Sequence, residues 1–321
     1  MDGLILVNKP QGLTSHDIVI KIRKLFNIQK VGHFGTLDPL ATGLLVVSVG
    51  KATRLSQFYV KKDKTYQGQI RLGYSTDTYD SLGKRTSEII ELYPEKNTLI
   101  SEIKKFEGEI DQLPPPYSAK KYKGKPLYVY ARQKKAIKIK SRKVFIHFFR
   151  LKNYHSPLID FEVKCSSGTY IRSLAHDLGQ NLGCRAHLTQ LKRTHVGKFS
   201  VENSFTLEEI HGLAKEDKID SFFLPLEILL PEFPKIILKD QGSVSAQNGN
   251  LISSDEILKV FPGEQFPTSQ ILKYEQESIF KLFTRDGKLI AFARKTPGNN
   301  LLHPFLVIGT VDEQKIKSKK Q

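Results

Sequence analysis

Hydrophobic residues recur along this chain with two different periods, which predicts a mixture of helices and strands. Between Ile18 and Phe26 the apolar residues lie three or four positions apart, and Thr14 and Asp17 before them have the spacing of a capping box. This pattern predicts a helix over residues 15–26. Residues 66–72 instead alternate between two kinds of side chain, which is typical of a half-buried strand.

The same two periods predict further elements in the first two thirds of the chain. We expect strands over residues 3–8, 44–49, 144–151 and 159–165, helices near residues 97–106, 125–134, 170–182 and 206–215, and a loop rich in glycine and proline over residues 31–43. Thr206 and Glu209 have the spacing of a second capping box. Helices do not alternate regularly with strands. The pattern therefore predicts an α+β fold in which helices flank a mixed, largely antiparallel sheet.

A change in pattern near residue 230 predicts a domain boundary. Pro225, Pro231 and Pro234 cluster there, and the residues that follow form mostly short apolar runs. Asp286–Gly287 between two such runs predicts a tight hairpin. We expect a first domain over residues 1–230, a small β-rich domain over 231–312 and a basic disordered tail over 313–321.

Net charge narrows the class of partner. The chain has 50 Lys and Arg against 33 Asp and Glu, a formal charge of +17, and such an excess favours a polyanion, either nucleic acid or an anionic membrane surface. The longest apolar run, residues 44–49, is far below the roughly 20 residues that span a bilayer. Two cysteines without zinc-type spacing predict a reducing compartment and no metal site. We therefore expect a cytoplasmic protein.

One carboxylate stands out in the loop that precedes the buried strand at residues 44–49. Asp38 lies in the sequence GHFGTLDPLATG, residues 32–43, and Pro39 restricts the backbone on both sides of the Asp–Pro bond. A carboxylate held on a rigid turn beside a strand is placed as catalytic groups are. An Asp that only caps an Asp–Pro turn has the same local sequence.

The longer string GHFGTLDPLATGLL resembles the catalytic loop of the TruB-type bacterial tRNA pseudouridine synthases, whose Asp is the nucleophile. Other segments resemble that family in order and spacing: KPQG at residues 9–12, KTY at 64–66, the loop at 71–80, QLPPPYSA at 112–119, YAR at 130–132 and SGTYIR at 167–172. The resemblance covers about residues 3–215. Phe34 departs from it, since the family usually has a smaller residue there, and we expect this change to alter how the loop packs against RNA.

The resemblance implies a pseudouridine-synthase fold and an isomerase that converts uridine 55 in the T loop of tRNA to pseudouridine. The target base must be flipped out of its stack to be reached. The reaction needs no electron carrier, so the expectation is no cofactor and no metal. It also implies a monomer that binds the tRNA T arm without an obligatory protein partner.

Three catalytic residues follow from the resemblance: Asp38, Tyr66 and Arg172. Asp38 would attack ribose C1′ or uracil C6, or assist elimination through a glycal, and the sequence does not choose between these routes. Arg172 would pair with the Asp38 carboxylate, and its alternative is a surface phosphate contact. Tyr66 would stack on the flipped base and take part in proton transfer at the sugar, whereas a strand tyrosine without that motif is usually a core residue.

Six further residues are assigned to substrate binding by the resemblance: His33, Tyr170, Asp80, Leu191, Lys9 and Arg132. His33 would wedge into the T loop, Asp80 would join the ionic network around Arg172, and Tyr170 and Leu191 would line the pocket. These four residues have plainer alternatives: an incidental loop His, a solvated loop Asp, a structural Tyr and an ordinary core Leu.

A basic insertion near residues 112–143 is expected to grip the RNA, since cations neutralise phosphates and aromatic rings stack on unpaired bases. Its members are Lys120, Lys121, Lys123, Lys125, Arg132, Lys134, Lys135, Lys138, Lys140, Arg142 and Lys143, with Tyr117, Tyr122, Tyr128 and Tyr130 among them. A solvated basic face has the same composition. Residues 233–312 resemble a small PUA-type RNA-binding domain, and a different β-rich module is the alternative.

Two other functions compete with the stand-alone tRNA enzyme. One is an RNA chaperone or binding module in which Asp38 has no catalytic role. The other is a dyskerin-type synthase that works on guide RNAs inside a larger complex.

Overall fold

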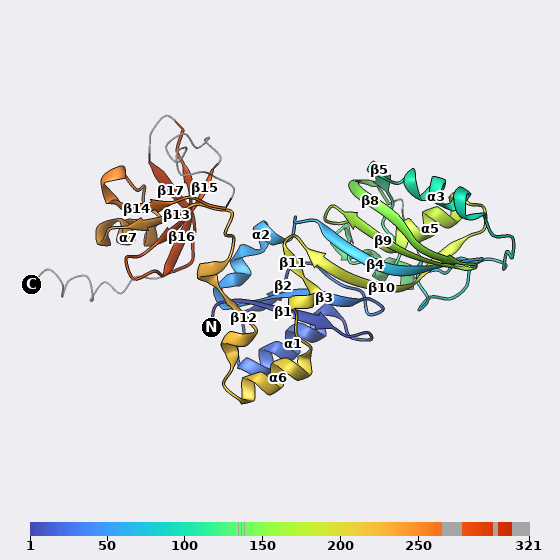
Figure 1. Cartoon of the computed structure of the whole chain (residues 1–321), viewed down its shortest axis with the longest axis horizontal. Coiled ribbons are helices and arrows are strands. Elements are labelled where there is room, and N and C mark those ends of the chain that lie inside the picture. Colours follow the sequence, from blue (N-terminus) through green and yellow to red (C-terminus); the bar gives the residue numbers. More distant parts are fainter. Residues whose placement is uncertain (134, 136, 138, 265–277, 298–300, 310–321) are drawn as a thin grey trace, which may run out of the picture. The chain divides into compact units, whose positions relative to one another are not determined.

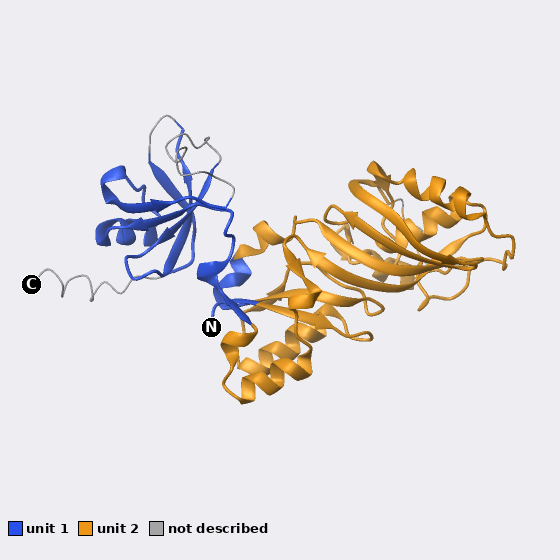
Figure 2. Ribbon diagram, viewed as in Figure 1, with its two compact units in different colours: residues 1–4, 49–54, 223–321 blue, residues 5–48, 55–222 orange. Residues whose placement is uncertain are grey.

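The computed structural model describes residues 1–133, 135, 137, 139–264, 278–297 and 301–309. It divides into two compact units, shown in Figure 2. One consists of residues 5–48 and 55–222, and the other of residues 1–4, 49–54 and 223–321. The predicted basic tail at 313–321 lies outside the described residues.

A ten-stranded sheet dominates the structure (Figure 1). Its main path runs β12 (Phe223–Pro225), β1 (Gly3–Lys9), β3 (Thr42–Val49), β10 (Ala186–Val196), β4 (Lys64–Leu72), β9 (Leu158–Cys165), β8 (Arg142–His155) and β5 (Gly108–Gln112), with β2 (Val31–His33) beside β3 and β11 (Phe199–Ser200) beside β10. The β10–β3 pair is parallel. The pairs β10–β4, β4–β9, β9–β8 and β8–β5 are antiparallel. The predicted α+β class with a mixed, largely antiparallel sheet is therefore confirmed.

Six α-helices accompany the described part of this sheet: α1 (Ser15–Phe26), α2 (Ser56–Tyr59), α3 (Lys96–Lys104), α4 (Leu127–Arg132), α5 (Ile171–Asn181) and α6 (Leu207–Lys215). Both predicted capping boxes are present, Thr14 with Asp17 before α1 and Thr206 with Glu209 before α6. In Figure 1, α1 and α6 lie below the sheet and α3 and α5 lie above it. A short connection, residues 166–170, joins the end of β9 to α5, whose second residue is Arg172.

The structure differs from the sequence prediction most at β10, a central strand for which the sequence predicted no element. It buries the polar residues His187, Arg193 and Thr194 among the apolar residues Leu188, Leu191 and Val196, so the alternation that marks a strand is obscured. Two register shifts, between Leu188 and Gln190 and between Arg193 and His195, also break the period of two. Positions where buried polar residues break the local pattern are expected at functional sites.

Smaller differences concern the ends of elements. The predicted loop at residues 31–43 contains β2, and β3 begins two residues earlier than predicted. The predicted helix at 125–134 is reduced to α4, because residues 125–126 form β7 (Lys125–Pro126), which pairs with β6 (Lys121–Tyr122).

The ring of Phe34 lies inside the fold. It is 1% exposed and stacks on Tyr59 with 5.2 Å between ring centroids. The extra size of this residue is therefore accommodated in the core, and its effect on how the loop packs against RNA stays a prediction.

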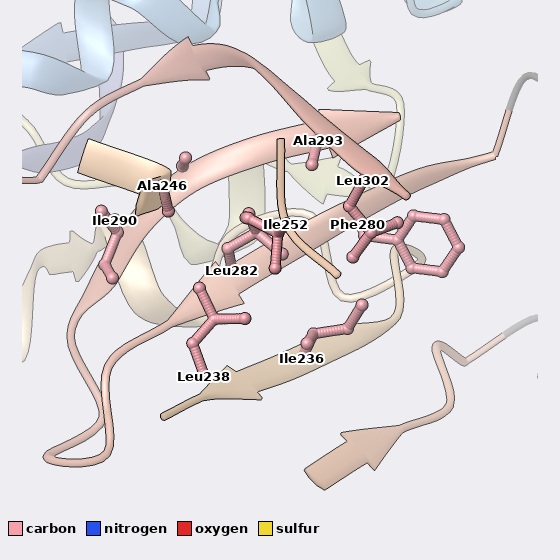
Figure 3. Close-up of a cluster of buried hydrophobic side chains, with 10 residues drawn as sticks. Ile236, Leu238, Ala246, Ile252, Phe280, Leu282, Ile290, Ala293 and Leu302 are labelled. Carbon is pink, nitrogen blue, oxygen red and sulfur yellow. The ribbon is translucent and has the colours of Figure 1, made fainter. Parts of the chain in front are cut away.

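The C-terminal residues form a separate five-stranded sheet in the order β14 (Ile257–Phe261), β13 (Lys235–Leu238), β15 (Ile279–Phe283), β16 (Leu289–Lys295) and β17 (Leu302–Val307). Helix α7 (Asp240–Gln247) contributes Ala246 to its core. Figure 3 shows this core, in which Ile236, Leu282 and Leu302 point toward one another. The predicted β15–β16 hairpin around Asp286–Gly287 is present, with Gly287 at φ 84°.

Candidate active site

The loop that carries Asp38 is held from two sides. The Asp38 carbonyl accepts a hydrogen bond from the Ala41 amide at 3.0 Å, which closes a turn with Pro39 as its second residue. On one side the Gly12 amide donates to the Pro39 carbonyl at 2.8 Å. On the other, the buried Ser15 hydroxyl accepts from the Leu37 amide at 2.8 Å and donates to the Leu37 carbonyl at 3.1 Å. The loop therefore presents its carboxylate from a fixed backbone.

Asp38 is paired with a buried guanidinium. Nη2 of Arg172 lies 2.9 Å from Oδ2 of Asp38, and Nη1 lies 3.5 Å from Oδ2 of Asp80. The side chains of Arg172 and Asp80 are 6% and 7% exposed, whereas that of Asp38 is 41% exposed. One partner of the arginine is thus enclosed in protein, and the other faces solvent where a substrate can reach it.

Backbone carbonyls fix the same guanidinium. Arg172 donates from Nη1 to the Thr78 carbonyl and from Nη2 to the Tyr117 carbonyl, both at 3.0 Å. Asp80 in turn accepts from the Thr78 hydroxyl at 2.6 Å and the Leu82 amide at 3.1 Å. These contacts leave the Arg172 side chain with one orientation, aimed at Asp38.

A cavity of about 580 Å³ opens in front of the Asp38–Arg172 pair. Three parts of the chain supply most of its lining: the Asp38 loop, the strands β4 and β10, and the segment that leads into α5. Its lining residues include His33, Asp38, Lys64, Tyr66, Ser118, Tyr170, Arg172, Leu191 and Arg193. The volume is sufficient for a nucleoside-sized group.

Tyr66 and Arg193 lie opposite each other on adjacent strands. They are register partners in the β4–β10 pair, and both line the cavity. The charge of the Arg193 guanidinium acts on the Tyr66 phenol, and a guanidinium can donate but not accept a hydrogen bond. Burial raises the pKa of Tyr66, which keeps the phenol neutral at pH 7.

Buried cations gather beneath the cavity. Burial, together with the charge of Arg193, lowers the pKa of Lys9 to about 8 and that of Lys64 to about 8. The pKa of His33 is also lowered by burial and by Arg193. The Lys9 ammonium donates to the carbonyls of Pro10 and Leu13, at 2.9 and 2.7 Å. The floor of the site is therefore electropositive and suited to an anionic substrate.

Two polar atoms of the cavity lining lack a partner among the described residues. These are Nδ1 of His33 and Oγ of Ser118, both buried. Ser118 is 4% exposed and follows Tyr117, whose carbonyl holds Arg172. A buried polar atom without a partner is costly, so both atoms are available for a bound ligand.

The structure brings most of the predicted site residues together. His33, Asp38, Tyr66, Tyr170, Arg172 and Leu191 line the cavity, and Asp80 contacts Arg172 from behind. Lys9 is fully buried and does not line the cavity, yet the Asp38 charge acts on it. Arg132 lies elsewhere, exposed at the end of α4 with its guanidinium 5.4 Å from the centre of the Tyr128 ring.

Sequence reasoning missed Lys64, Ser118 and Arg193 as members of the site. Lys64 and Ser118 lie inside the quoted motifs but were given no role. Arg193 gave one usable signal, a charged residue two positions after Leu191 in a segment that is otherwise suited to a strand.

The basic insertion presents exposed cations and aromatic rings. Tyr122 and Tyr130 make an edge-to-face contact at 5.8 Å, and Lys123 lies over the Tyr122 ring. Lys134 and Lys138 of the predicted basic cluster lie outside the described residues. Among the residues that are described, no group of three or more His, Cys, Asp or Glu could hold a metal ion. In that same part of the chain no helix is long and apolar enough to cross a membrane.

Two family models match the chain. Residues 23–171 match the N-terminal domain of the TruB family pseudouridylate synthases, and residues 172–231 match the tRNA pseudouridylate synthase B C-terminal domain. A protein of Solibacter usitatus named tRNA pseudouridine synthase B is 40% identical over 308 residues, which cover 96% of this chain and 100% of the relative. A Vibrio vulnificus protein of the same name is 41% identical over 74% of this chain and 78% of its own length.

Solved structures show the same fold. A chain of an H/ACA ribonucleoprotein bound to a substrate RNA containing 2′-deoxyuridine aligns with a TM-score of 0.70 at 25% identity, covering 97% of this chain and 86% of that one. A chain of a Cbf5–Nop10–Gar1 complex aligns with a TM-score of 0.67 at 26% identity, covering 97% and 84%. With two matching family models that together span residues 23–231 and relatives at 40% identity over most of its length, this chain belongs to the TruB family of pseudouridylate synthases.

Proposed function

We propose that this protein isomerises uridine 55 in the T loop of tRNA to pseudouridine, with Asp38 as the nucleophile. The observation that carries the proposal is the Asp38–Arg172 ion pair at the mouth of a cavity of nucleoside size. Curated relatives at 40% and 41% identity are named tRNA pseudouridine synthase B, which supports tRNA as the substrate.

The chemistry suits a site built from side chains alone. Isomerisation breaks the N1–C1′ bond, turns the uracil and forms a C5–C1′ bond, while one proton leaves C5 and one is gained at N1. No electrons are exchanged, so no redox cofactor is required. The Arg172 guanidinium stabilises the ionised Asp38 carboxylate, which then attacks C1′ or C6 of the flipped nucleotide or assists elimination through a glycal.

Recognition of the flipped uridine is assigned to the cavity lining. Tyr66 stacks on the base, Tyr170 and Leu191 enclose it, and the unpartnered Ser118 hydroxyl is available to hydrogen-bond one of its polar edges. His33 lies on the loop side of the cavity, where it would wedge into the T loop. Lys9 acts from below, by fixing the turn that holds the Asp38 loop.

Surfaces outside the cavity bind the T arm of the tRNA. The basic insertion, including Arg132, would contact phosphates and unpaired bases of the arm. The five-stranded C-terminal sheet would act as a PUA-like RNA-binding domain. These assignments imply catalytic residues 1–230 followed by an RNA-binding unit at 231–312.

We propose that the enzyme acts alone, as a cytoplasmic monomer. The competing arrangement is that of the H/ACA complexes, whose chains have the same fold at 25–26% identity. The higher identity to proteins named as tRNA enzymes favours direct action on tRNA. A binding module without catalysis would have no use for a solvent-facing carboxylate paired to an enclosed arginine.

The test uses two transcripts. Purified protein, with no added RNA or protein, is incubated with an unmodified tRNA transcript and with one in which uridine 55 is replaced by cytidine, and pseudouridine is mapped along both. We expect one pseudouridine at position 55 of the first transcript and none in the second. Modification at another position would refute the assigned target, and activity only with a guide RNA would favour the H/ACA-type arrangement.

A further inference from the structure

Arg193 is a fully buried arginine that makes no ion pair with any described residue. It is 1% exposed, and its hydrogen-bond partners are all neutral backbone carbonyls. Nε donates to the Leu44 carbonyl at 2.8 Å, Nη1 to the Thr36 carbonyl at 3.3 Å and Nη2 to the Gly35 carbonyl at 3.0 Å. An arginine that served only the fold would usually be paired, because burying an uncompensated charge is expensive.

The backbone around Arg193 is shaped to receive it. Gly43 is its register partner on β3, has φ 93°, and a Cβ there would lie 2.4 Å from the Arg193 carbonyl oxygen. Gly35 has φ 123° and a Cβ there would meet the guanidinium at 3.4 Å. Gly43 thus permits the close approach of β3 to β10, and Gly35 supplies a positive φ that the loop backbone needs beside the guanidinium.

On its other side Arg193 faces Tyr66, its register partner on β4. The positive charge of the guanidinium acts on the phenol, and a guanidinium has no acceptor that could receive the phenol proton. The guanidinium therefore favours orientations in which the hydroxyl proton of Tyr66 points away from it, and both residues line the cavity that receives the nucleotide.

We propose that Arg193 is a positioning residue that acts through Tyr66: it directs the hydroxyl proton of Tyr66 toward the bound nucleotide and ties Tyr66 to the backbone of the nucleophile loop. One guanidinium then sets the distance between the proton-transfer group on β4 and the loop two residues before Asp38. The same positive charge stabilises the phenol oxygen whenever it gives up its proton. The proton is returned within the cycle, so the overall isomerisation stays balanced. This inference rests on the proposed function.

A double-mutant cycle tests the coupling. The enzymes to compare are wild type, Arg193→Lys, Tyr66→Phe and the double variant, each assayed for kcat and KM on unmodified tRNA. We expect Arg193→Lys to lower kcat by about a hundred-fold with KM changed less than about threefold. In the Tyr66→Phe background the same substitution should lower kcat by less than about threefold, because the oxygen on which it acts is absent.

A matched control separates this role from general loosening of the loop. Ser15→Ala removes the contact with Leu37 without touching Tyr66, and its effect on kcat should be the same in both backgrounds. If Arg193→Lys lowers kcat by the same factor in the Tyr66→Phe background as in wild type, or if it changes only KM, the proposal is overturned. If wild type makes no pseudouridine at all, it is the proposed function that fails.

A second measurement needs no substitution at Arg193. In ¹⁵N-arginine-labelled protein, the buried guanidinium signals are compared between wild type and Tyr66→Phe. We expect one protected Nη–H signal to move or to exchange faster in Tyr66→Phe. An unchanged spectrum would overturn the proposal even if the Arg193 variants failed to fold.

Discussion

Nη2 of Arg172 lies 2.9 Å from Oδ2 of Asp38, and the same guanidinium lies 3.5 Å from the enclosed carboxylate of Asp80. The arginine is therefore held from behind by one aspartate and presented to the other. We therefore expect substitutions of Arg172 and Asp38 to affect catalysis and a substitution of Asp80 to affect stability.

Arg172→Lys should lower kcat by about a hundred-fold or more, because an ammonium cannot make the parallel contacts of a guanidinium to Asp38 and two carbonyls. KM for tRNA should change much less. Steady-state kinetics on unmodified tRNA would check this. A rise in KM of similar size with kcat unchanged would instead identify Arg172 as a phosphate contact.

Asp80→Ala should destabilise the fold, because it leaves a guanidinium that is 6% exposed without its enclosed partner. Breaking such a buried pair costs about 3 kcal/mol. Urea unfolding measures the loss, and Asp160→Ala on the same sheet is a suitable comparison because Asp160 hydrogen-bonds Gln69 without an arginine partner. Equal stability of the two variants would contradict the network.

Because of Lys64, we expect the free energy of unfolding to change with pH in the alkaline range. The pKa of Lys64 is about 8 when folded against 10.5 unfolded, so between these values the unfolded chain binds more protons and stability rises with pH. The free energy of unfolding of wild type minus that of Lys64→Met should increase by about 2 kcal/mol from pH 7.5 to pH 9.5. The exposed Lys215→Met, measured the same way, should show no such trend.

Arg132 should contribute to tRNA affinity but not to chemistry, since it lies outside the cavity on α4. Arg132→Ala should reduce the slope of log Kd against log salt by about one and leave single-turnover rates at saturating enzyme unchanged. Lys215→Ala on α6 removes an equivalent charge and should leave the slope as in wild type. A slower single-turnover rate for Arg132→Ala would place this residue in the catalytic step.

Local patterns in the sequence predicted the fold class and most elements, including both capping boxes, because Thr14 and Thr206 satisfy helix amides within a few residues of themselves. They failed at β10, where buried polar residues such as Arg193 and two register shifts interrupt the alternation that marks a strand. Asp38 could be singled out from its rigid Asp–Pro turn and from its resemblance to the family loop. The role of Arg193 could not, because it depends on the pairing of β10 with β3 and β4, strands more than a hundred residues away in the chain.

The central claim is that the Asp38 carboxylate is the nucleophile, and Asp38→Asn tests it most directly because the amide keeps the size of the side chain. Wild type and variant are incubated side by side with an unmodified tRNA transcript, and pseudouridine and tRNA affinity are both measured. We predict at least a roughly thousand-fold loss of product with tRNA affinity within about threefold of wild type. Pseudouridine formed by Asp38→Asn at a rate near that of wild type would contradict the account.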